Sequence, residues 1–272
     1  MKNMENYIGM VGKTVKKRSK FSYAVFKVVR FLVRVFYGKA EVIGLENLPD
    51  HNAILVGNHS QMNGPIVGEL FLPKNCYIWC VGQMMHRKEV PEYAYQDFWS
   101  HKPKWTRPFY KVLSHLMAPL ASCLLGNART IAVYRDNRII TTFKETVAMM
   151  KSGNNVLIFA ENEKPHNNIV NEFNENFIDV AKLYYKKTGE EVQFVPLYVA
   201  PALRKLYIGK GIQFDSQKPI DSERKRIAAY LSDEITKIAR ALPEHRVVPF
   251  LNIPKKNYLT NKDATRVPKI SE

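Results

Sequence analysis

The chain has 272 residues, 46% of them hydrophobic, and 41 Lys and Arg against 25 Asp and Glu give it a formal net charge of +16. This length and apolar content provide for a sizeable core, which suits one large domain or one domain with an appendage. The positive excess indicates a polyanionic partner: nucleic acid, anionic lipid or a phosphorylated substrate. Three cysteines, Cys76, Cys80 and Cys123, lack C-x2-C spacing, which argues against disulfides and a zinc site.

The first element of the chain is a basic, apolar stretch. Residues 11–40 contain nine Lys or Arg residues and no acid. Within them, residues 21–37 read FSYAVFKVVRFLVRVFY, in which Lys27, Arg30 and Arg34 share one helical stripe among bulky apolar residues. This pattern predicts a basic amphipathic N-terminal helix that lies on an anionic membrane surface. The alternative is an ordinary helix whose wide apolar face packs on the domain.

The same stretch bears on location and partners. Its apolar part covers about 17 residues and includes three charges, short of the ~20 mainly apolar residues that a membrane span needs. No small-residue cleavage site follows it, so we expect a cytoplasmic protein that is peripheral on the membrane. A nucleic-acid partner is disfavoured, because the basic residues alternate with Phe and Val at helical spacing and no nucleic-acid motif is present.

The remainder of the chain alternates strands with helices. This rhythm predicts an α/β fold with a mostly parallel central sheet flanked by helices. We expect a basic segment over 1–38, one α/β domain over 39–253 and a polar, loosely held tail over 254–272. The expected elements are strands at 41–44, 53–56, 77–81, 130–134, 155–159 and 192–199, and helices at 65–71, 108–125, 137–151 and 175–187.

A histidine follows the apolar strand 53–56. His59 lies on the turn between this strand and the helix that opens at Pro65, where parallel sheets present reactive side chains. Its imidazole has an ordinary pKa of ~6.5, which suits a general base at neutral pH. The amide of Asn63 either orients this imidazole or only caps the helix.

Three later segments also follow or contain predicted strands: GNARTIAVYR at 126–135, FAENEK at 159–164 and VPLY at 195–198. Together with Asn58 and His59, and in this order, they resemble the four motif blocks of the glycerol-3-phosphate and lysophosphatidic acid acyltransferase superfamily. The resemblance covers roughly residues 40–215. It implies an enzyme that transfers an acyl group.

Two of the blocks depart from the family's pattern. The family has His-x4-Asp in the first block, and position 64 here is Gly64. The third block is usually Phe-Pro-Glu-Gly-Thr-Arg, which only Phe159 and Glu161 match outright. The chain therefore resembles a divergent branch, with either altered acceptor contacts or lost activity. If the protein is active, Gly64→Asp is expected to raise kcat, since it restores the charge that stabilises an imidazolium.

The resemblance also implies roles for the other site residues. Arg135 would bind an acceptor phosphate, because a guanidinium binds phosphate oxygens bidentately, and Lys164 would add a second positive charge. Glu161 would accept a hydrogen bond from a glycerol hydroxyl or hold Arg135 in place. The alternative for these three residues is a solvated cluster of ion pairs at strand ends. Because His59, Arg135 and Glu161 each follow a strand, we expect them to share a pocket.

Two functions follow from these interpretations. The first is a membrane-associated O-acyltransferase that moves an acyl group from acyl-CoA or acyl-carrier protein to a lysophosphatidic-acid-like acceptor, with His59 as the general base. It needs no metal and no cofactor, because the acyl thioester is a substrate. The second is a catalytically silent relative that binds lipid or membrane through the same scaffold.

Overall fold

The computed structural model describes residues 19–100 and 102–263. Contacts divide the chain into two compact units: unit 1 combines Met1–Gly38 with Trp79–Ala148, and unit 2 combines Lys39–Ile78 with Met149–Glu272. The parts of the predicted N-terminal segment and C-terminal tail at 1–18 and 264–272 lie outside the described residues. The predicted domain boundaries therefore stay a prediction.

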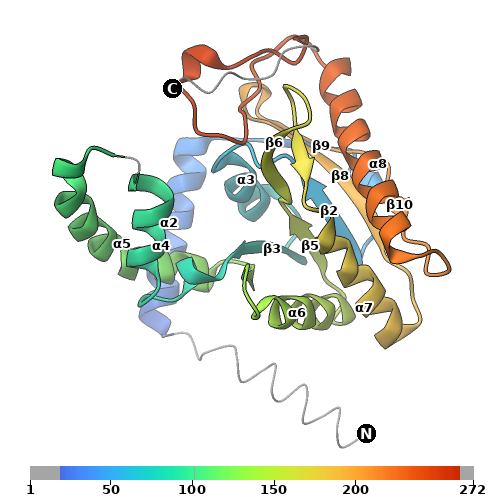
Figure 1. Cartoon of the computed structure of the whole chain (residues 1–272), viewed down its shortest axis with the longest axis horizontal. Helices are drawn as coiled ribbons and strands as arrows, with labels where there is room; N and C mark the ends of the chain where they lie inside the picture. The colour runs from blue at the N-terminus through green and yellow to red at the C-terminus, as the bar shows by residue number, and fades with distance from the viewer. Residues whose placement is uncertain (1–18, 101, 264–272) are drawn as a thin grey trace, which may run out of the picture. The chain divides into compact units, whose positions relative to one another are not determined.

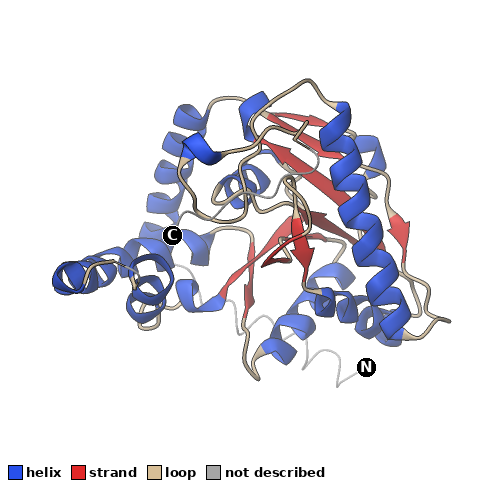
Figure 2. Cartoon of the chain, turned by 45° about the horizontal axis from the view of Figure 1, so that its top comes forward, coloured by secondary structure: helices blue, strands red, loops and turns tan. Residues whose placement is uncertain are grey.

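Unit 2 is built around a sheet with helices beside it (Figures 1 and 2). β8 pairs in parallel with β2, β2 with β5, and β5 with β3, whereas β8 and β9 are antiparallel. The prediction of a mostly parallel α/β fold is confirmed. The sheet order is β1 (Glu41–Ile43), β9 (Lys205–Ile208), β8 (Gln193–Ala200), β2 (Ala53–Gly57), β5 (Asn155–Ile158) and β3 (Cys76–Val81), with β10 (Ile212–Gln213) antiparallel to β8.

The central strands form the core. Every residue of β2 and of β5 is buried, because strands of a parallel sheet are covered on both faces and therefore read as continuous apolar runs. The side chain of Asn155 fixes the register at one end: it accepts a hydrogen bond from Ala53 N (2.8 Å) and donates one to Pro49 O (2.9 Å). The longer helices of unit 2 are α3 (Asn63–Phe71), α7 (Asp179–Thr188) and α8 (Ile220–Ala241), and its short helical turns include η1 (Leu45–Asn47), η5 (Glu175–Ile178) and η6 (Pro201–Leu203).

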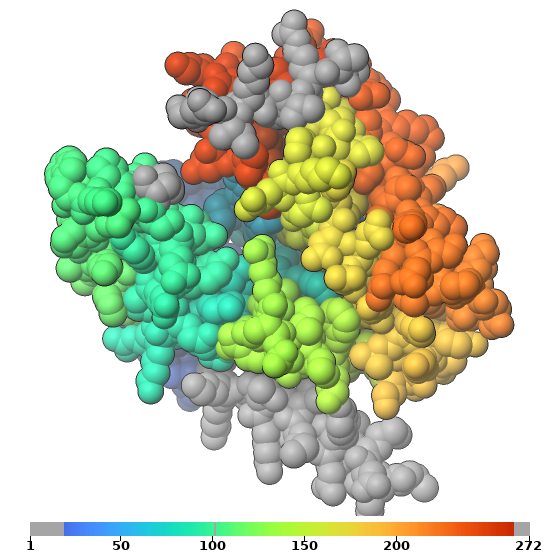
Figure 3. Space-filling model, viewed as in Figure 1, coloured from blue at the N-terminus to red at the C-terminus, as the bar shows by residue number. Residues whose placement is uncertain are grey.

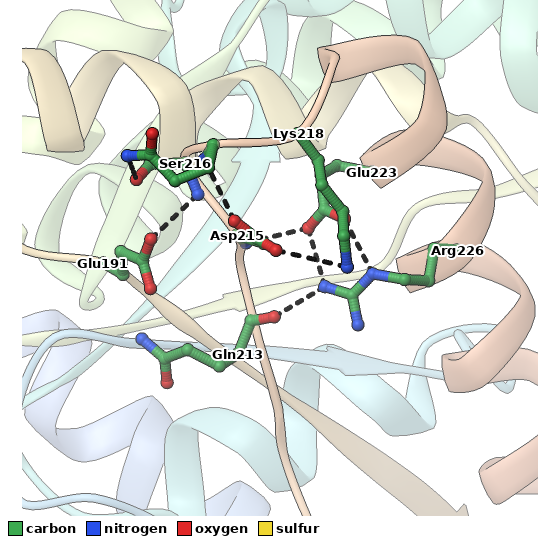
Figure 4. A network of polar contacts seen from close by, with 8 residues as sticks. Glu191, Gln213, Asp215, Ser216, Lys218, Glu223 and Arg226 are labelled. Carbon is green, nitrogen blue, oxygen red and sulfur yellow. Dashed lines mark hydrogen bonds and ion pairs between the residues drawn. The ribbon is translucent and has the colours of Figure 1, made fainter.

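Helix α8 lies along β8, and a polar network secures its first turns (Figure 4). The carboxylate of Glu223 is fully buried and accepts hydrogen bonds from Asp215 N (2.8 Å) and from the Arg226 guanidinium (2.6 and 2.7 Å). Arg226 also donates to Gln213 O (2.7 Å). A buried carboxylate is tolerated here because its charge is paired and hydrogen-bonded. The network ties β10 to the helix.

Two segments of unit 2 differ from the sequence expectation. Residues 161–173 contain a hairpin of β6 (Glu161–Pro165) and β7 (Asn171–Phe173), which the apolar pattern does not predict. The chain from 254 to 263 is not loosely held: it contains η7 (Lys255–Asn257), and Thr260 forms a β-bridge with Arg246. On the face drawn in Figure 3 the hairpin (yellow) adjoins the C-terminal residues (red), consistent with the Asn168 Nδ2 to Thr260 O bond of 2.6 Å.

Unit 1 is mainly helical. The predicted N-terminal helix is present as α2 (Lys20–Tyr37), which begins where the Ser19 hydroxyl accepts a hydrogen bond from Ser22 N (3.0 Å). It packs on α5, where Asn127 Nδ2 donates to Ser22 Oγ (2.7 Å). β3 continues into this unit, and β4 lies next to it. The other elements are η2 (Gly82–Met85), α4 (Val90–Ala94), η3 (Tyr95–Trp99), η4 (Lys104–Thr106), α5 (Arg107–Asn127), β4 (Thr130–Val133) and α6 (Ile139–Lys151).

Much of the apolar surface of unit 1 is exposed. Phe26 is the buried residue of α2, whereas Phe21 and Phe36 are 80% and 85% exposed. Helix α5 likewise exposes Phe109 and Leu116. Among the described residues, the stretch Lys104–Asn127 is long and apolar enough to cross a membrane, by length and composition only.

Candidate functional site

The loop that carries His59 begins where β2 ends. Asn58 is buried, and its side chain continues the sheet by accepting from Val199 N (2.7 Å) and donating to Val199 O (3.2 Å). Ser60 and Gln61 then both have left-handed backbone, with φ of 50° and 55°. Such conformations cost about 1–3 kcal/mol each in residues other than glycine and cluster at functional sites. His59 is therefore held on a strained turn.

The turn closes by main-chain hydrogen bonds. Asn63 N donates to Ser60 O and Gly64 N donates to His59 O, both at 3.1 Å. The side chain of Asn63 also donates to Ser60 O (2.9 Å), so it supports the turn. That the same amide orients His59 stays a prediction.

Glu161 holds the turn from the neighbouring strand. It follows β5 and is buried, and its two carboxylate oxygens accept hydrogen bonds from the main-chain N–H groups of His59 and Asn171, the latter at 2.7 Å. Burial raises the pKa of this carboxyl to about 7, against the effect of the two N–H donors, which lower it. The structure thus brings Glu161 to His59, as expected, through the main chain of His59.

The imidazole of His59 lies between two aromatic rings. Phe159 and Phe250 approach it edge to face, with ring centroids 5.3 and 5.9 Å from that of His59. Burial lowers the pKa of His59 below its ordinary value, and a hydrogen bond with the Gln61 backbone acts in the opposite direction. A lowered pKa keeps the ring neutral at pH 7, the form in which it can accept a proton.

Position 64 has no space for a side chain. A Cβ built on Gly64 would lie 2.6 Å from His59 O and 2.7 Å from Cε1 of Phe159. The ring of Phe159 therefore occupies the space that a carboxylate at position 64 would need. The departure from His-x4-Asp is built into the packing of the loop, and the expectation that Gly64→Asp raises kcat loses its structural basis.

Three residues of this site, Phe250, Leu251 and Tyr258, carry no signal in the sequence. Gln61 Nε2 donates to Leu251 O (3.2 Å) and to Tyr258 Oη (3.0 Å), and Phe250 packs on His59. All are contacts between residues about 190 positions apart, so neither periodicity nor motif spacing indicates them.

The two predicted cations lie elsewhere. Lys164 is in β6, 73% exposed, and pairs with Glu172 at 2.8 Å, which fits the ion-pair alternative for this residue. Arg135 belongs to unit 1, where it follows β4 and is exposed. Among the residues that the structure describes it makes no ion pair, so its guanidinium is available to an anion. That Arg135 shares a pocket with His59 stays a prediction.

The arginine three residues further on is different. Arg138 pairs with Asp136 (2.7 Å) and Glu89 (3.1 Å), and its guanidinium lies 4.0 Å from the centroid of the Tyr134 ring. The hydroxyl of Tyr134 in turn bonds to His86 Nε2 (2.8 Å). Arg138 is therefore already engaged within unit 1.

Comparison with known proteins finds a distant likeness to solved structures. No protein-family model and no curated protein sequence matches the chain. Among solved structures, the chain is similar to the crystal structure of the 1-acyl-sn-glycerophosphate (LPA) acyltransferase PlsC from Thermotoga maritima, at 17% identity and a TM-score of 0.44, over 85% of this chain and 88% of that chain.

Proposed function

We propose that the protein is a membrane-associated O-acyltransferase that moves an acyl group from a thioester, acyl-CoA or acyl-carrier protein, to a phosphorylated glycerol-type acceptor such as a lysophosphatidic acid. The observation that carries this proposal is the half-buried imidazole of His59, on a strained turn at the end of β2 with Glu161 bonded beneath it. An uncharged imidazole at the carboxyl edge of a parallel sheet suits removal of a hydroxyl proton.

In this reaction His59 accepts the proton of the acceptor hydroxyl as its oxygen attacks the thioester carbonyl. The tetrahedral intermediate collapses with cleavage of the C–S bond, and the imidazolium returns the proton to the departing thiolate. Arg135 supplies the charge that binds the acceptor phosphate, since it is exposed and makes no ion pair among the described residues. Lys164 would contribute only after leaving Glu172.

The exposed apolar residues of α2 support a peripheral position on an anionic membrane. Phe21 and Phe36 are exposed on the same helix as Lys27, Arg30 and Arg34, a combination of apolar and basic groups typical of interfacial helices.

A second function, lipid binding without catalysis, is favoured by one observation. Gly64 leaves no space for the carboxylate that would stabilise an imidazolium in the resembling family. The two functions are separated by measuring acyl transfer by the purified protein from a labelled thioester to a panel of lysolipids. Acyl transfer that disappears in His59→Ala supports the enzyme; lysolipid or vesicle binding without transfer supports the silent relative.

A further inference from the structure

The segment 246–260, called here the C-terminal strap, forms a closed loop over His59. Its ends are joined, since Arg246 and Thr260 form a bridge and Val247 N donates to Leu259 O at 2.9 Å. Its middle carries Phe250, whose ring meets the imidazole of His59 edge to face. The strap therefore contacts one side of the His59 imidazole through Phe250.

The ends of the strap are fixed in the core. His245, just before it, is buried and bonds through Nε2 to the hydroxyl of Tyr198 (2.8 Å), a fully buried residue of β8. Asn261, just after it, is also buried; its Oδ1 accepts from His245 N (2.9 Å), and its Nδ2 donates to Ala239 O of α8 (2.7 Å). Because both ends are anchored to regular elements, the strap can hold its partners in a defined position.

The strap is bonded to the two residues that follow His59. Ser60 Oγ donates to Val248 O (3.4 Å), and the amide of Gln61 donates to Leu251 O and to Tyr258 Oη. Phe250 lies between the two carbonyl groups that accept these bonds. The bonds that hold the left-handed residues thus also place the aromatic ring on the imidazole.

We propose that this strap orients the imidazole of His59 in place of the missing carboxylate, with Phe250 and Tyr258 as positioning residues: Phe250 through the ring of His59, and Tyr258 through the side chain of Gln61. The inference deepens the proposed function and rests on it for its catalytic consequence. In bases that have a carboxylate partner, the carboxylate fixes the tautomer and the ring orientation. Here two aromatic rings pack on the imidazole, and the Gln61 backbone that bonds to the imidazole is held by the bonds of the Gln61 side chain to the strap.

Positioning acts on the reacting geometry, so its loss lowers kcat more than it changes KM. Two variants remove hydrogen bonds between Gln61 and the strap and change little else in the fold. Tyr258→Phe deletes only the hydroxyl that accepts from Gln61. Gln61→Gly deletes both side-chain bonds and tolerates the positive φ of this position. The matched control is Tyr230→Phe, which removes a tyrosine hydroxyl that donates to Lys210 O at 3.0 Å in the same unit.

The experiment combines acyl-transfer kinetics with nuclear magnetic resonance of the histidine ring nitrogens, in which His59→Ala identifies the His59 signals. We expect both variants to melt as cooperatively as the wild type and to lower kcat about 10- to 100-fold, with KM changed little. Their His59 nitrogen shifts should move toward a mixture of the two tautomers. Tyr230→Phe should alter neither measurement.

The two readouts separate this inference from the proposed function. Wild-type protein without acyl transfer rejects the enzyme, and the ring spectra still report whether the strap orients His59. His59 signals that coincide in wild type, Tyr258→Phe and Gln61→Gly overturn the inference, as does a loss of kcat that Tyr230→Phe shares.

Discussion

The main-chain N–H of His59 donates a hydrogen bond to the carboxylate of Glu161, a residue 102 positions later in the chain. The bond is possible because β2 and β5 are neighbours in register, with Val56 opposite Ile158, so the residues beyond their carboxyl ends meet. Glu161 reaches the candidate base through the base's own backbone, and its protonation is coupled to the stability of the turn.

The first prediction is a dependence of stability on pH. Burial raises the pKa of Glu161 from 4.5 to about 7, so its contribution is fully present below pH 4.5 and is lost as the pH rises through 7. The shift corresponds to roughly 3 kcal/mol in the free energy of unfolding. Urea unfolding at pH 5 and pH 8 should show this loss in the wild type and not in Glu161→Gln. An equal pH dependence of the two proteins would contradict it.

The second prediction concerns Gly64. Gly64→Asp and Gly64→Ala should destabilise the protein by about 1–3 kcal/mol and lower acyl transfer, because the new Cβ displaces Phe159 or the His59 carbonyl. The control is Gly126→Ala in α5, where a Cβ meets no atom within 4 Å and alanine is the better helix former. Thermal melting and kcat are the measurements, and a Gly64→Asp protein with higher kcat would refute the steric argument.

The third prediction is the pH profile of acyl transfer. His59 must be neutral to accept a proton, and burial lowers its pKa below 6.5, so kcat/KM should fall on acidification with its half-maximal value at a pH below 6.5. The profile is measured between pH 5 and 8. Glu161→Gln separates the two groups, since a fall caused by His59 persists in that variant. A profile of Glu161→Gln that is half-maximal above pH 6.5 would be inconsistent with a base whose pKa is lowered by burial.

The fourth prediction compares two arginines. Arg135→Gln should raise the KM for a phosphorylated acceptor about 10- to 100-fold, the effect of losing a hydrogen bond between charged groups. Arg138→Gln is the control, because Arg138 is held by Asp136 and Glu89. Steady-state kinetics with phosphorylated and unphosphorylated acceptors test this. Equal effects of both variants would remove Arg135 from the proposed site.

The fifth prediction concerns the membrane. Replacing Lys27, Arg30 and Arg34 by Gln should weaken binding to anionic vesicles by about 1 kcal/mol per residue at low salt, and Phe36→Ser should weaken binding to anionic and neutral vesicles alike. Vesicle flotation measures both. The charge-matched control carries Gln at three exposed lysines of α7, Lys182, Lys186 and Lys187. If this control loses as much binding, charge alone and not the helix explains the attraction.

Much of the fold can be predicted from the sequence because its strands are buried on both faces. The apolar runs of β2, β5 and β8 can be recognised in the sequence as strands, and the residues that follow them can be recognised as turns. The β6–β7 hairpin is not visible, since its first strand reads ENEKP and only Glu161 in it is buried. Its stability depends on contacts with other segments, which a local pattern does not encode.

The candidate site is only partly predictable, for the same reason. His59 and Glu161 follow strands, so their meeting could be expected. The absence of space at Gly64 depends on where the ring of Phe159 points, and the contact between Phe250 and His59 depends on the whole fold. Neither of these two features corresponds to a recognisable spacing of residues in the sequence.

The bonds of Ser60 and Gln61 to the strap join residues 188 to 197 positions apart. During synthesis the histidine therefore leaves the ribosome long before the residues that hold its turn. The side-chain bonds of the left-handed residues cannot form until the strap has been made and folded, and long-range contacts of this kind form slowly. His59 therefore reaches its final conformation late in folding. A chain that ends before the strap would contain His59 without the bonds that hold its turn.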